Sequence, residues 1–389
     1  MISRLFISLA SGLLALPVSA TTFELPDEET RVVGHNLIVY SRQEDTLLDI
    51  GRKFDLGYTE MTTANPNLDP WLPGENQPVL IPNRFILPDV PQKGVVVNIP
   101  EMRLFYFPPK QANQLQQVVT HPIGIGREGR DTPLGVLSII QKRENPSWTP
   151  PESIRREHAA AGDILPAVVP PGPDNPLGTR AIRLSNPSYL IHGTAKPYGV
   201  GLRVSSGCIR LYPEDIEHLY SLVSLNTQVN IINQPYKAAV ANGKLFLEAH
   251  QPLSDISDAE SDSGNMTPMV RAVLAAQDSV LSEQDWPYAE EVVMSANGVV
   301  KQLGQQHDKI VDNVWFVHGG LQQETGSKVR QALQQLQMED KFWPLRNAAS
   351  NEVVVGPFDS LDAAREAADN ISQVAGIPVW PAHLAEELF

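Results

Sequence analysis

The chain has 389 residues, 42% of them hydrophobic, so it is long enough for two or three domains with separate cores. Its formal net charge of −15 excludes a protein that binds nucleic acid through a basic surface, and we predict no nucleic-acid partner. The nine histidines are scattered and there is a single cysteine. Because neither a paired-cysteine nor an HExxH pattern is present, we predict no metal site and no cofactor.

Residues 1–20 have the pattern of a secretory signal peptide. An apolar run from Leu5 to Val18 ends in small residues, and we predict cleavage after Ala20. A membrane anchor is the alternative, but the run is shorter than the roughly 20 apolar residues that a membrane span needs. We therefore expect an exported mature protein in an oxidising compartment such as a bacterial periplasm, without a transmembrane anchor.

Residues 36–83 are predicted to form a small β-α-α-β unit. A β-like run precedes a helix start at Asp45-Thr46, a second helix is expected near Thr59, and a strand closes the unit. The unit resembles the LysM module in three motifs: Asp45-Thr46-Leu47, Ala64-Asn65-Pro66 and Ile81-Pro82. This resemblance implies binding to glycan that contains N-acetylglucosamine, such as peptidoglycan. A spacer domain without glycan affinity is the alternative.

Residues 94–234 are predicted to form a mainly-β domain, with an extension to residue 253. Seven short β-rich runs are separated by Gly and Pro: 95–99, 104–107, 118–121, 135–140, 181–184, 189–192 and 228–232. The proline-rich stretch 144–178, with a short helical pattern, connects the fourth and fifth runs. A connection of this length is typical of a functional loop or lid, and a solvated excursion without a role is the alternative.

The only cysteine, Cys208, lies in a Ser-Ser-Gly-Cys turn sixteen residues after His192. An unpaired thiol in an oxidising compartment is prone to oxidation, so we expect its chemistry to be used; a small buried hydrophobic residue is the alternative. The attacking form is the thiolate, which needs a base, and His192 is the candidate. The Gly193 carbonyl is expected to accept a hydrogen bond from the imidazole and fix its tautomer. A structural histidine at the end of a strand is the alternative.

Gly207 allows the chain to turn sharply before the cysteine. We expect the backbone N–H groups of Gly207 and Cys208 to form an oxyanion hole. Two serine-based acyl-transfer patterns can be excluded. No serine has a lysine three positions later, and Arg203 stands where a G-x-S-x-G turn needs its first glycine.

These residues resemble the YkuD L,D-transpeptidases, most closely their ErfK/YbiS/YcfS/YnhG group from Gram-negative envelopes. The motifs that carry the resemblance are His192-Gly193-Thr194, GLRVSSGCIRL at 201–211, PIGIGREGRDTPLGVLSI and NPSWTPPESI. The resemblance covers about residues 94–253. It implies a periplasmic enzyme whose Cys208 attacks the meso-diaminopimelate carbonyl of a peptidoglycan tetrapeptide stem and expels D-alanine.

The resemblance leaves the acyl acceptor open. Another stem's diaminopimelate would give a cross-link, a lysine of an outer-membrane lipoprotein would give protein anchoring, and water would make the enzyme a carboxypeptidase or hydrolase. A catalytically vestigial peptidoglycan-binding adaptor is the alternative of another class. The expected substrate-binding residues, for some of which a salt bridge or core packing is the alternative, are Arg210, Arg203, Ser206, Tyr198 and Trp148.

Residues 254–310 read as an acidic, serine-rich linker followed by a helical segment. Residues 311–385 then show a β-α-β-β-α-β order, which predicts a ferredoxin-like α+β domain. The strand VVVGPF, followed by Ser360 as a helix cap and an alanine-rich helix, resembles the SPOR domain. This resemblance implies binding to denuded glycan strands, and an unrelated ferredoxin-like interaction domain is the alternative.

Overall fold

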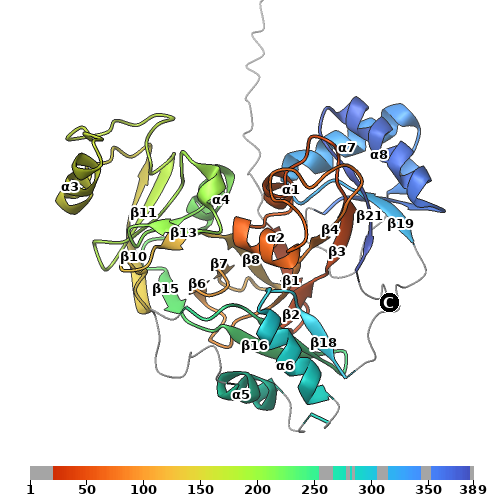
Figure 1. The fold of residues 1–389 in the computed structure, drawn as a ribbon, viewed down its shortest axis with the longest axis horizontal. Helices are drawn as coiled ribbons and strands as arrows, with labels where there is room; N and C mark the ends of the chain where they lie inside the picture. Colours follow the sequence, from red (N-terminus) through yellow and green to blue (C-terminus); the bar gives the residue numbers. More distant parts are fainter. Residues whose placement is uncertain are drawn as a thin grey trace, which may run out of the picture.

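The computed structural model describes residues 21–253, 266–276, 281–282, 285–304, 314–342 and 352–385. The predicted signal peptide and the acidic stretch 254–265 lie outside these residues. Figure 1 shows a large β-sheet domain beside a group of smaller elements formed by the two ends of the described chain. Among the described helices, none combines the length and apolar character that crossing a membrane requires.

A nine-stranded mixed sheet forms the main domain, as the β-rich runs predict. Its strands in spatial order are β1 (Thr21–Leu25), β8 (Gln116–Pro122), β7 (Arg103–Phe107), β6 (Gly94–Asn98), β15 (Gln228–Ile232), β10 (Gly135–Glu144), β11 (Arg180–Leu184), β12 (Leu190–His192) and β14 (Ile209–Arg210). Neighbours are antiparallel except for the pairs β15–β6 and β12–β14. Two short strands, β9 (Ile125–Gly126) and β13 (Arg203–Ser205), pair separately.

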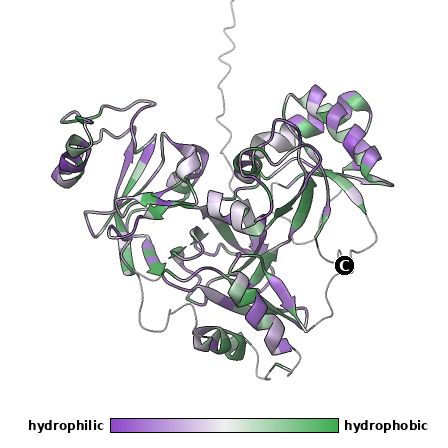
Figure 2. Ribbon diagram, in the orientation of Figure 1, coloured by the Kyte–Doolittle hydropathy of each residue, from purple (hydrophilic) through white to green (hydrophobic). Residues whose placement is uncertain are grey.

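Helix α4 (Pro213–Leu222) packs on this sheet and closes its core. The helix begins with a proline and carries two acidic residues in its first turn, both of which suit a helix N-terminus. Its Ile216 and Leu219 are fully buried in a cluster with the β-branched residues of β6 and β15. Helix α3 (Glu152–Ala160), in the predicted lid, has no buried residue, and Figure 2 shows that it is largely hydrophilic.

The predicted β-α-α-β order of residues 36–83, hereafter the βααβ unit, is confirmed. It consists of β3 (Leu37–Tyr40), α1 (Leu47–Lys53), α2 (Tyr58–Ala64) and β4 (Pro78–Ile81), and β3 pairs antiparallel with β4. Thr46 caps α1 by accepting a hydrogen bond from the N–H of Asp49 at 3.0 Å. Strands β2 (Val32–Gly34) and β5 (Arg84–Ile86) flank the unit as a separate pair.

The C-terminal residues extend the sheet of the βααβ unit. Their elements are β19 (Trp315–His318), α7 (Gln323–Leu336), β20 (Val354–Phe358), α8 (Leu361–Ala375) and β21 (Trp380–Leu384). The strand expected between α7 and β20 falls mostly in 343–350, outside the described residues. The sheet order is β20-β19-β21-β3-β4, because β21 pairs antiparallel with β3. The structure thus joins two segments that we expected to be separate domains.

Residues 236–303 form a small α/β unit, which differs from the expected linker and extension. Strands β16 (Tyr236–Ala241), β17 (Lys244–Ala249) and β18 (Lys301–Leu303) make a three-stranded sheet. Helices α5 (Thr267–Ala276) and α6 (Asp285–Ser295) pack on it and share one hydrophobic cluster with it. The sequence shows the helical periodicity, but two of the three partner strands, β16 and β17, lie on the other side of the acidic stretch.

One buried and one partly exposed ion pair attach the βααβ unit to the domain of the nine-stranded sheet. Arg103 of β7 is fully buried; its Nη2 lies 2.7 Å from Glu60 Oε1 and donates to the carbonyl of Asp55 at 2.9 Å. Arg52 of α1 donates two hydrogen bonds to the carboxylate of Glu214 on α4, at 2.7 and 2.8 Å. The unit is therefore held rigidly against the domain that carries Cys208.

Candidate active site

Strands β12 and β14 bring His192 and Cys208 to the same face of the sheet. The strands are parallel, and His192 lies opposite Arg210. Cys208 directly precedes β14 and therefore lies opposite Leu190, whose backbone N–H donates a hydrogen bond to the thiol. Because alternate residues of a strand share a face, the thiol, the imidazole and the Arg210 side chain belong to the same side of the sheet.

The turn before Cys208 is held by Ser205, a residue of the turn itself. Ser205 Oγ accepts a hydrogen bond from the N–H of Gly207 at 3.1 Å and donates one to the carbonyl of Cys208 at 2.6 Å. Gly207 has a φ of +100°, and a Cβ there would lie 2.7 Å from a ring carbon of Tyr189. The turn therefore needs glycine. The Gly207 N–H, expected in the oxyanion hole, is already engaged by Ser205.

Thr132 fixes this turn from outside, and sequence reasoning missed it. Its hydroxyl donates to the carbonyl of Gly207 at 3.0 Å and accepts from the N–H of Gly126 at 3.0 Å. Thr132 is almost fully buried. The signal was present in the Gly-Arg-Glu-Gly-Arg-Asp-Thr block, which we used for the resemblance but not for a residue role.

His192 is buried, and its tautomer follows from its hydrogen bond to the next residue. Nδ1 lies 2.6 Å from the carbonyl oxygen of Gly193, which can only accept, so Nδ1 carries the proton. Nε2 is then left as the basic nitrogen of the neutral ring. This is the arrangement that we expected from the His-Gly sequence.

The surroundings keep the Cys208 thiol and the His192 imidazole neutral. Burial raises the pKa of the Cys208 thiol, although the Leu190 hydrogen bond and the charges of Arg210 and Arg183 oppose this. Burial lowers the pKa of His192 to about 4, helped by Arg210 and opposed by the hydrogen bond to Gly193. At neutral pH the site therefore holds a thiol and a neutral imidazole, so the thiolate forms only when a base takes the thiol proton.

A cavity of about 690 Å³ opens beside the thiol. Cys208, Ser206 and Tyr189 line it on one side, and the predicted lid lines it through Trp148 and Ile154. The lid's backbone is anchored by the buried Asn175, whose amide donates to three carbonyls of the lid at 2.9 to 3.3 Å. The long proline-rich connection thus contributes to the site.

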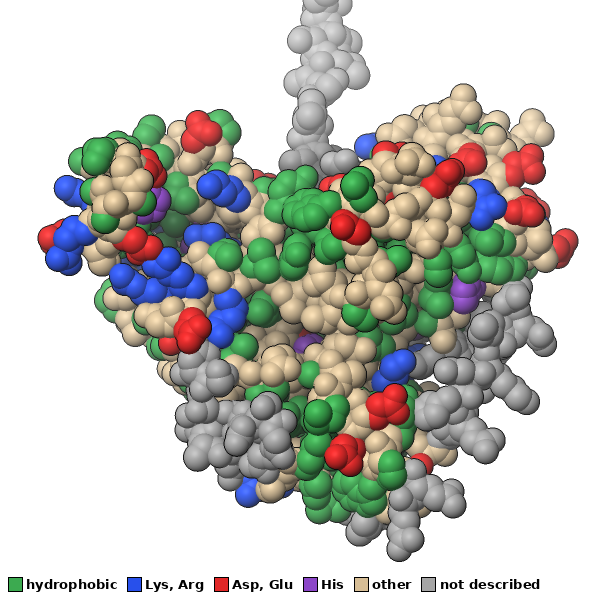
Figure 3. Space-filling model, in the orientation of Figure 1, with side chains coloured by type: hydrophobic (Ala, Val, Ile, Leu, Met, Phe, Trp, Pro, Cys, Tyr) green, Lys and Arg blue, Asp and Glu red, His purple; other side chains and the backbone are tan. Residues whose placement is uncertain are grey.

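The cavity is basic, although the whole chain is acidic. Arg130, Arg143 and Arg183 line it, with Asp131. Figure 3 shows Lys and Arg side chains gathered over strands β10 and β11 of the same domain. Sequence reasoning missed these arginines because three separate segments contribute them; Arg130 lies in the motif PIGIGREGRDTPLGVLSI, but the motif gave it no role.

Three expected substrate-binding residues do not line this cavity. Arg210 lies on the face of His192, and its Nε is buried with no hydrogen-bond partner among the described residues. Arg203 forms an ion pair with Asp131 at 3.2 Å, which is the structural alternative given for it above. Tyr198 is exposed and packs edge to face against Trp71 of the βααβ unit, with ring centroids 6.0 Å apart.

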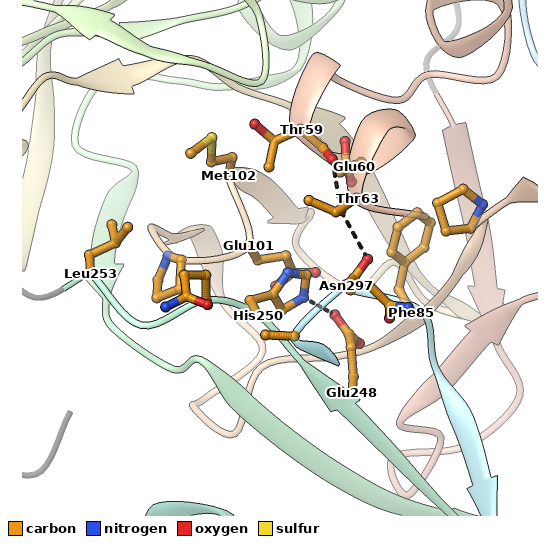
Figure 4. A pocket seen from close by; sticks show the side chains of 15 residues that line it. Thr59, Glu60, Thr63, Phe85, Glu101, Met102, Glu248, His250, Leu253 and Asn297 are labelled. Carbon is orange, nitrogen blue, oxygen red and sulfur yellow. Dashed lines mark hydrogen bonds and ion pairs between the residues drawn. The ribbon is translucent and has the colours of Figure 1, made fainter. Parts of the chain in front are cut away.

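Two buried clusters elsewhere have a composition that can hold a metal ion. Asp55, His121 and Asp215 form one; Glu101, Glu248 and His250 form the other. The second lines a small cavity of about 70 Å³, shown in Figure 4.

The second cluster already contains a cation. Lys237 Nζ lies 2.8 Å from Glu101 and 2.9 Å from Glu248, so the ammonium group balances these carboxylates. His250 in turn lies 2.7 Å from Glu248. Neither cluster includes Cys208, so neither belongs to the thiol site.

Comparison with known proteins gives the family. Residues 92–231 match the YkuD family, described as the L,D-transpeptidase catalytic domain. The chain is 46% identical to the probable L,D-transpeptidase YcfS of Escherichia coli over 64% of this chain and 78% of the relative. It is 43% identical to the probable L,D-transpeptidase ErfK/SrfK of Escherichia coli, over 67% and 84%. It is 37% identical to the probable L,D-transpeptidase YbiS of Escherichia coli, over 73% and 92%. The chain therefore belongs to the YkuD family of L,D-transpeptidases, and it is an enzyme of the ErfK/YbiS/YcfS type.

Proposed function

We propose that the protein is an exported peptidoglycan L,D-transpeptidase in which Cys208 is the nucleophile and His192 the general base. One observation carries this proposal. The thiol and a neutral imidazole lie on the same face of the sheet, and the imidazole Nδ1 is hydrogen-bonded to the carbonyl of Gly193. The basic cavity beside the thiol supports it further, because the stem peptides of peptidoglycan carry carboxylates.

The first half of the reaction acylates the cysteine. His192 Nε2 takes the thiol proton as sulfur attacks the carbonyl of the third stem residue, meso-diaminopimelate. The tetrahedral intermediate collapses, the bond to the terminal D-alanine breaks, and the leaving amine takes the proton from His192. A thioester on Cys208 remains. Since both groups start neutral, proton transfer accompanies the attack and does not precede it.

The second half transfers the acyl group to an amine. The acceptor amine attacks the thioester carbonyl while His192 Nε2 removes its proton, and the Cys208 thiol is regenerated with that proton. We propose the Cys208 N–H as a donor to the oxyanion. The Gly207 N–H can contribute only if it leaves Ser205 Oγ, 3.1 Å away, so the serine rotamer becomes part of the catalytic cycle.

We propose that the arginines of the cavity bind the carboxylates of the stem peptide. Arg183 of β11 lies opposite Gln141 of β10, and Arg143 of β10 lies opposite Ala181 of β11. Both arginines line the cavity with Arg130. Planar guanidinium groups bind carboxylates through paired hydrogen bonds. Arg210, with its unpartnered Nε, is the proposed contact for the carboxylate nearest the reacting carbonyl.

The location and the accessory segments are part of the same proposal. Cleavage after Ala20 would release the protein into the periplasm of a Gram-negative bacterium. The βααβ unit, with its LysM-like motifs, and the SPOR-like C-terminal segment would bind glycan strands and raise the local concentration of stems. Because the structure merges these two segments into one five-stranded sheet, we propose that they act as one glycan-binding body.

The acceptor is tested by mass spectrometry of sacculi digested after incubation with the enzyme, with and without a purified outer-membrane lipoprotein. Stem-to-stem products indicate cross-linking, stem-to-lysine products indicate anchoring, and shortened stems indicate hydrolysis. Cys208→Ala should give none of these. Arg183→Gln should raise KM, whereas Arg156→Gln on the exposed face of α3 is the matched control. Equal KM values for the two variants would exclude the assigned role of Arg183.

Incubation with a carbapenem tests the assignment of Cys208 as the nucleophile. A covalent adduct on the intact protein that disappears in Cys208→Ala supports this assignment, and folded wild-type protein without an adduct contradicts it.

A further inference from the structure

A buried acidic site lies where the βααβ unit meets the nine-stranded sheet. Asp55 follows α1, His121 is on β8, and Asp215 is in the first turn of α4. Their ligand atoms lie within 4.8 Å of one another, and His121 Nδ1 is 3.4 Å from Asp215 Oδ1. His121 is 0% exposed, Asp215 5% and Asp55 8%.

The charges around this site leave the two carboxylates without a cation of their own. Arg103 is nearby, but its guanidinium is bound to Glu60, and Arg52 is bound to Glu214. Burial lowers the pKa of His121 to about 4, so the imidazole is neutral at neutral pH. Burial, together with the charge of Asp215, raises the pKa of Asp55 to about 7, and burial raises the pKa of Asp215 well above its usual value.

Several polar atoms at the site have no hydrogen-bond partner among the described residues. They are Asp215 Oδ2, both ring nitrogens of His121, and Thr21 Oγ1. A buried polar atom without a partner costs about 1–3 kcal/mol. The site thus offers three acceptors, namely the Asp215 oxygen, one nitrogen of the neutral imidazole and the Thr21 hydroxyl oxygen, to a group that carries positive charge and several donors.

Such a group is one covalent step away. Thr21 begins β1, is 1% exposed, and its backbone nitrogen donates to Asp55 Oδ2 at 3.3 Å. Thr21 pairs with Thr120, directly before His121. This nitrogen belongs to the peptide bond after Ala20, where the signal peptide is expected to be cleaved.

We propose that signal-peptide removal creates the cation of this site. A signal peptidase and one water hydrolyse the Ala20–Thr21 peptide bond, which leaves a carboxylate on Ala20 and an α-ammonium group on Thr21. The ammonium group pairs with Asp55 and Asp215. Its three N–H donors replace the single N–H of the amide and match the unpartnered acceptors around it.

The consequence is that processing completes the packing of the βααβ unit on the enzyme. In the precursor the nitrogen is a neutral amide, so the two carboxyl groups must either stay protonated or be buried with a negative charge that no cation of the site balances. After cleavage the same position supplies a buried ion pair that links β1, the end of α1 and the start of α4. This inference rests on the proposed cleavage after Ala20.

The test compares two forms of the full mature chain made without export. One begins at Thr21, released from a fusion by a protease that leaves no extra residue, and the other carries one additional alanine before Thr21. We expect the Thr21 form to unfold at least about 4 °C higher at pH 7. Equal unfolding temperatures would overturn the proposal.

Substitutions test whether the difference in unfolding temperature between the two forms depends on the buried acidic site. Asp55→Asn should remove most of the gap between the two forms, and Asp215→Asn serves the same purpose if Asp55→Asn does not fold. Glu24→Gln, on the exposed side of β1, is the matched control and should leave the gap unchanged. A gap that survives both site variants contradicts the ion pair.

Two further measurements separate the alternatives. Zinc chloride that stabilises both forms equally would identify the cluster as a metal site and overturn the proposal. N-terminal sequencing of the exported protein tests the cleavage position separately. A mature chain that begins elsewhere would refute the processing step even if the Thr21 form were the more stable in vitro.

Discussion

The rate of Cys208 acylation should depend little on pH from about 5.5 to 8. In Arg210→Gln the rate should begin to fall at a higher pH than in the wild type as the solution is made more acidic. Because the neutral imidazole is needed as the base, the rate should fall as His192 becomes protonated. This acid limb of the pH–rate profile should therefore follow the pKa of His192, which is lowered from 6.5 to about 4. This difference in pKa means that protonating His192 costs roughly 3 kcal/mol more in the folded protein than in the unfolded chain. Stability should therefore fall as pH drops below 6.5 towards 4, because the unfolded chain binds the proton more readily.

The variant tests one cause of this lowered pKa. Burial is the larger cause and the charge of Arg210 the second, so Arg210→Gln should raise the pKa of His192 by about one pH unit, and the acid limb with it. The same change should raise the pKa of Cys208 further, because the arginine charge favours the thiolate. The pKa values of His192 and Cys208 are thus both expected to move to higher pH.

The acid limb is measured by single-turnover acylation with a carbapenem at pH values from 4 to 9. The loss of β-lactam absorbance gives the rate at each pH. Iodoacetamide alkylation over the same range reports the thiolate. Arg156→Gln, which removes an exposed arginine of the lid, is the control. A wild-type acid limb near 6.5, together with thiolate reactivity below pH 7, would show a preformed thiolate-imidazolium pair and refute the reasoning.

Three further outcomes are expected. Cys208→Ala should abolish transfer and shift the unfolding temperature by less than about 2 °C, which calorimetry checks. Glu60→Gln should cost about 3–5 kcal/mol in urea unfolding, because it leaves the buried charge of Arg103 without its partner; a cost below 1 kcal/mol would mean that the pair is solvated. Deleting 314–385 should make the βααβ unit sensitive to proteases, since it exposes the edge of β3; unchanged resistance would show that the two segments fold independently.

Local patterns were sufficient for most of the secondary structure. The alternating apolar runs of the sheet domain, the Thr46 cap and the order β-α-α-β all depend on residues close together in the chain. His192 and Cys208, which were predicted from a strand end and a glycine turn, lie on the same face of the sheet. The arginines of the cavity could not, since three separate segments contribute them.

The pairing of β21 with β3 shows where local reasoning fails. Each strand is hydrophobic and satisfies the pattern of its own small module, so both segments were assigned to complete, separate domains. In the structure Trp380 of β21 is buried in the cluster of the βααβ unit, and its indole N–H donates to Asp45 at 2.8 Å. Asp45 was read as part of a helix-start motif, a role that gave no reason to look for a partner.

That contact changes how the accessory segments should be tested. Their strands share one sheet and their cores meet at Trp380, so removing the C-terminal segment to probe glycan binding would also damage the βααβ unit. Loss of sacculus binding after such a deletion would then report on folding as much as on recognition. Substitutions at exposed positions avoid this ambiguity. Trp71, half exposed beside Tyr198 at the junction with the catalytic domain, is the position where a change should affect binding without loss of core.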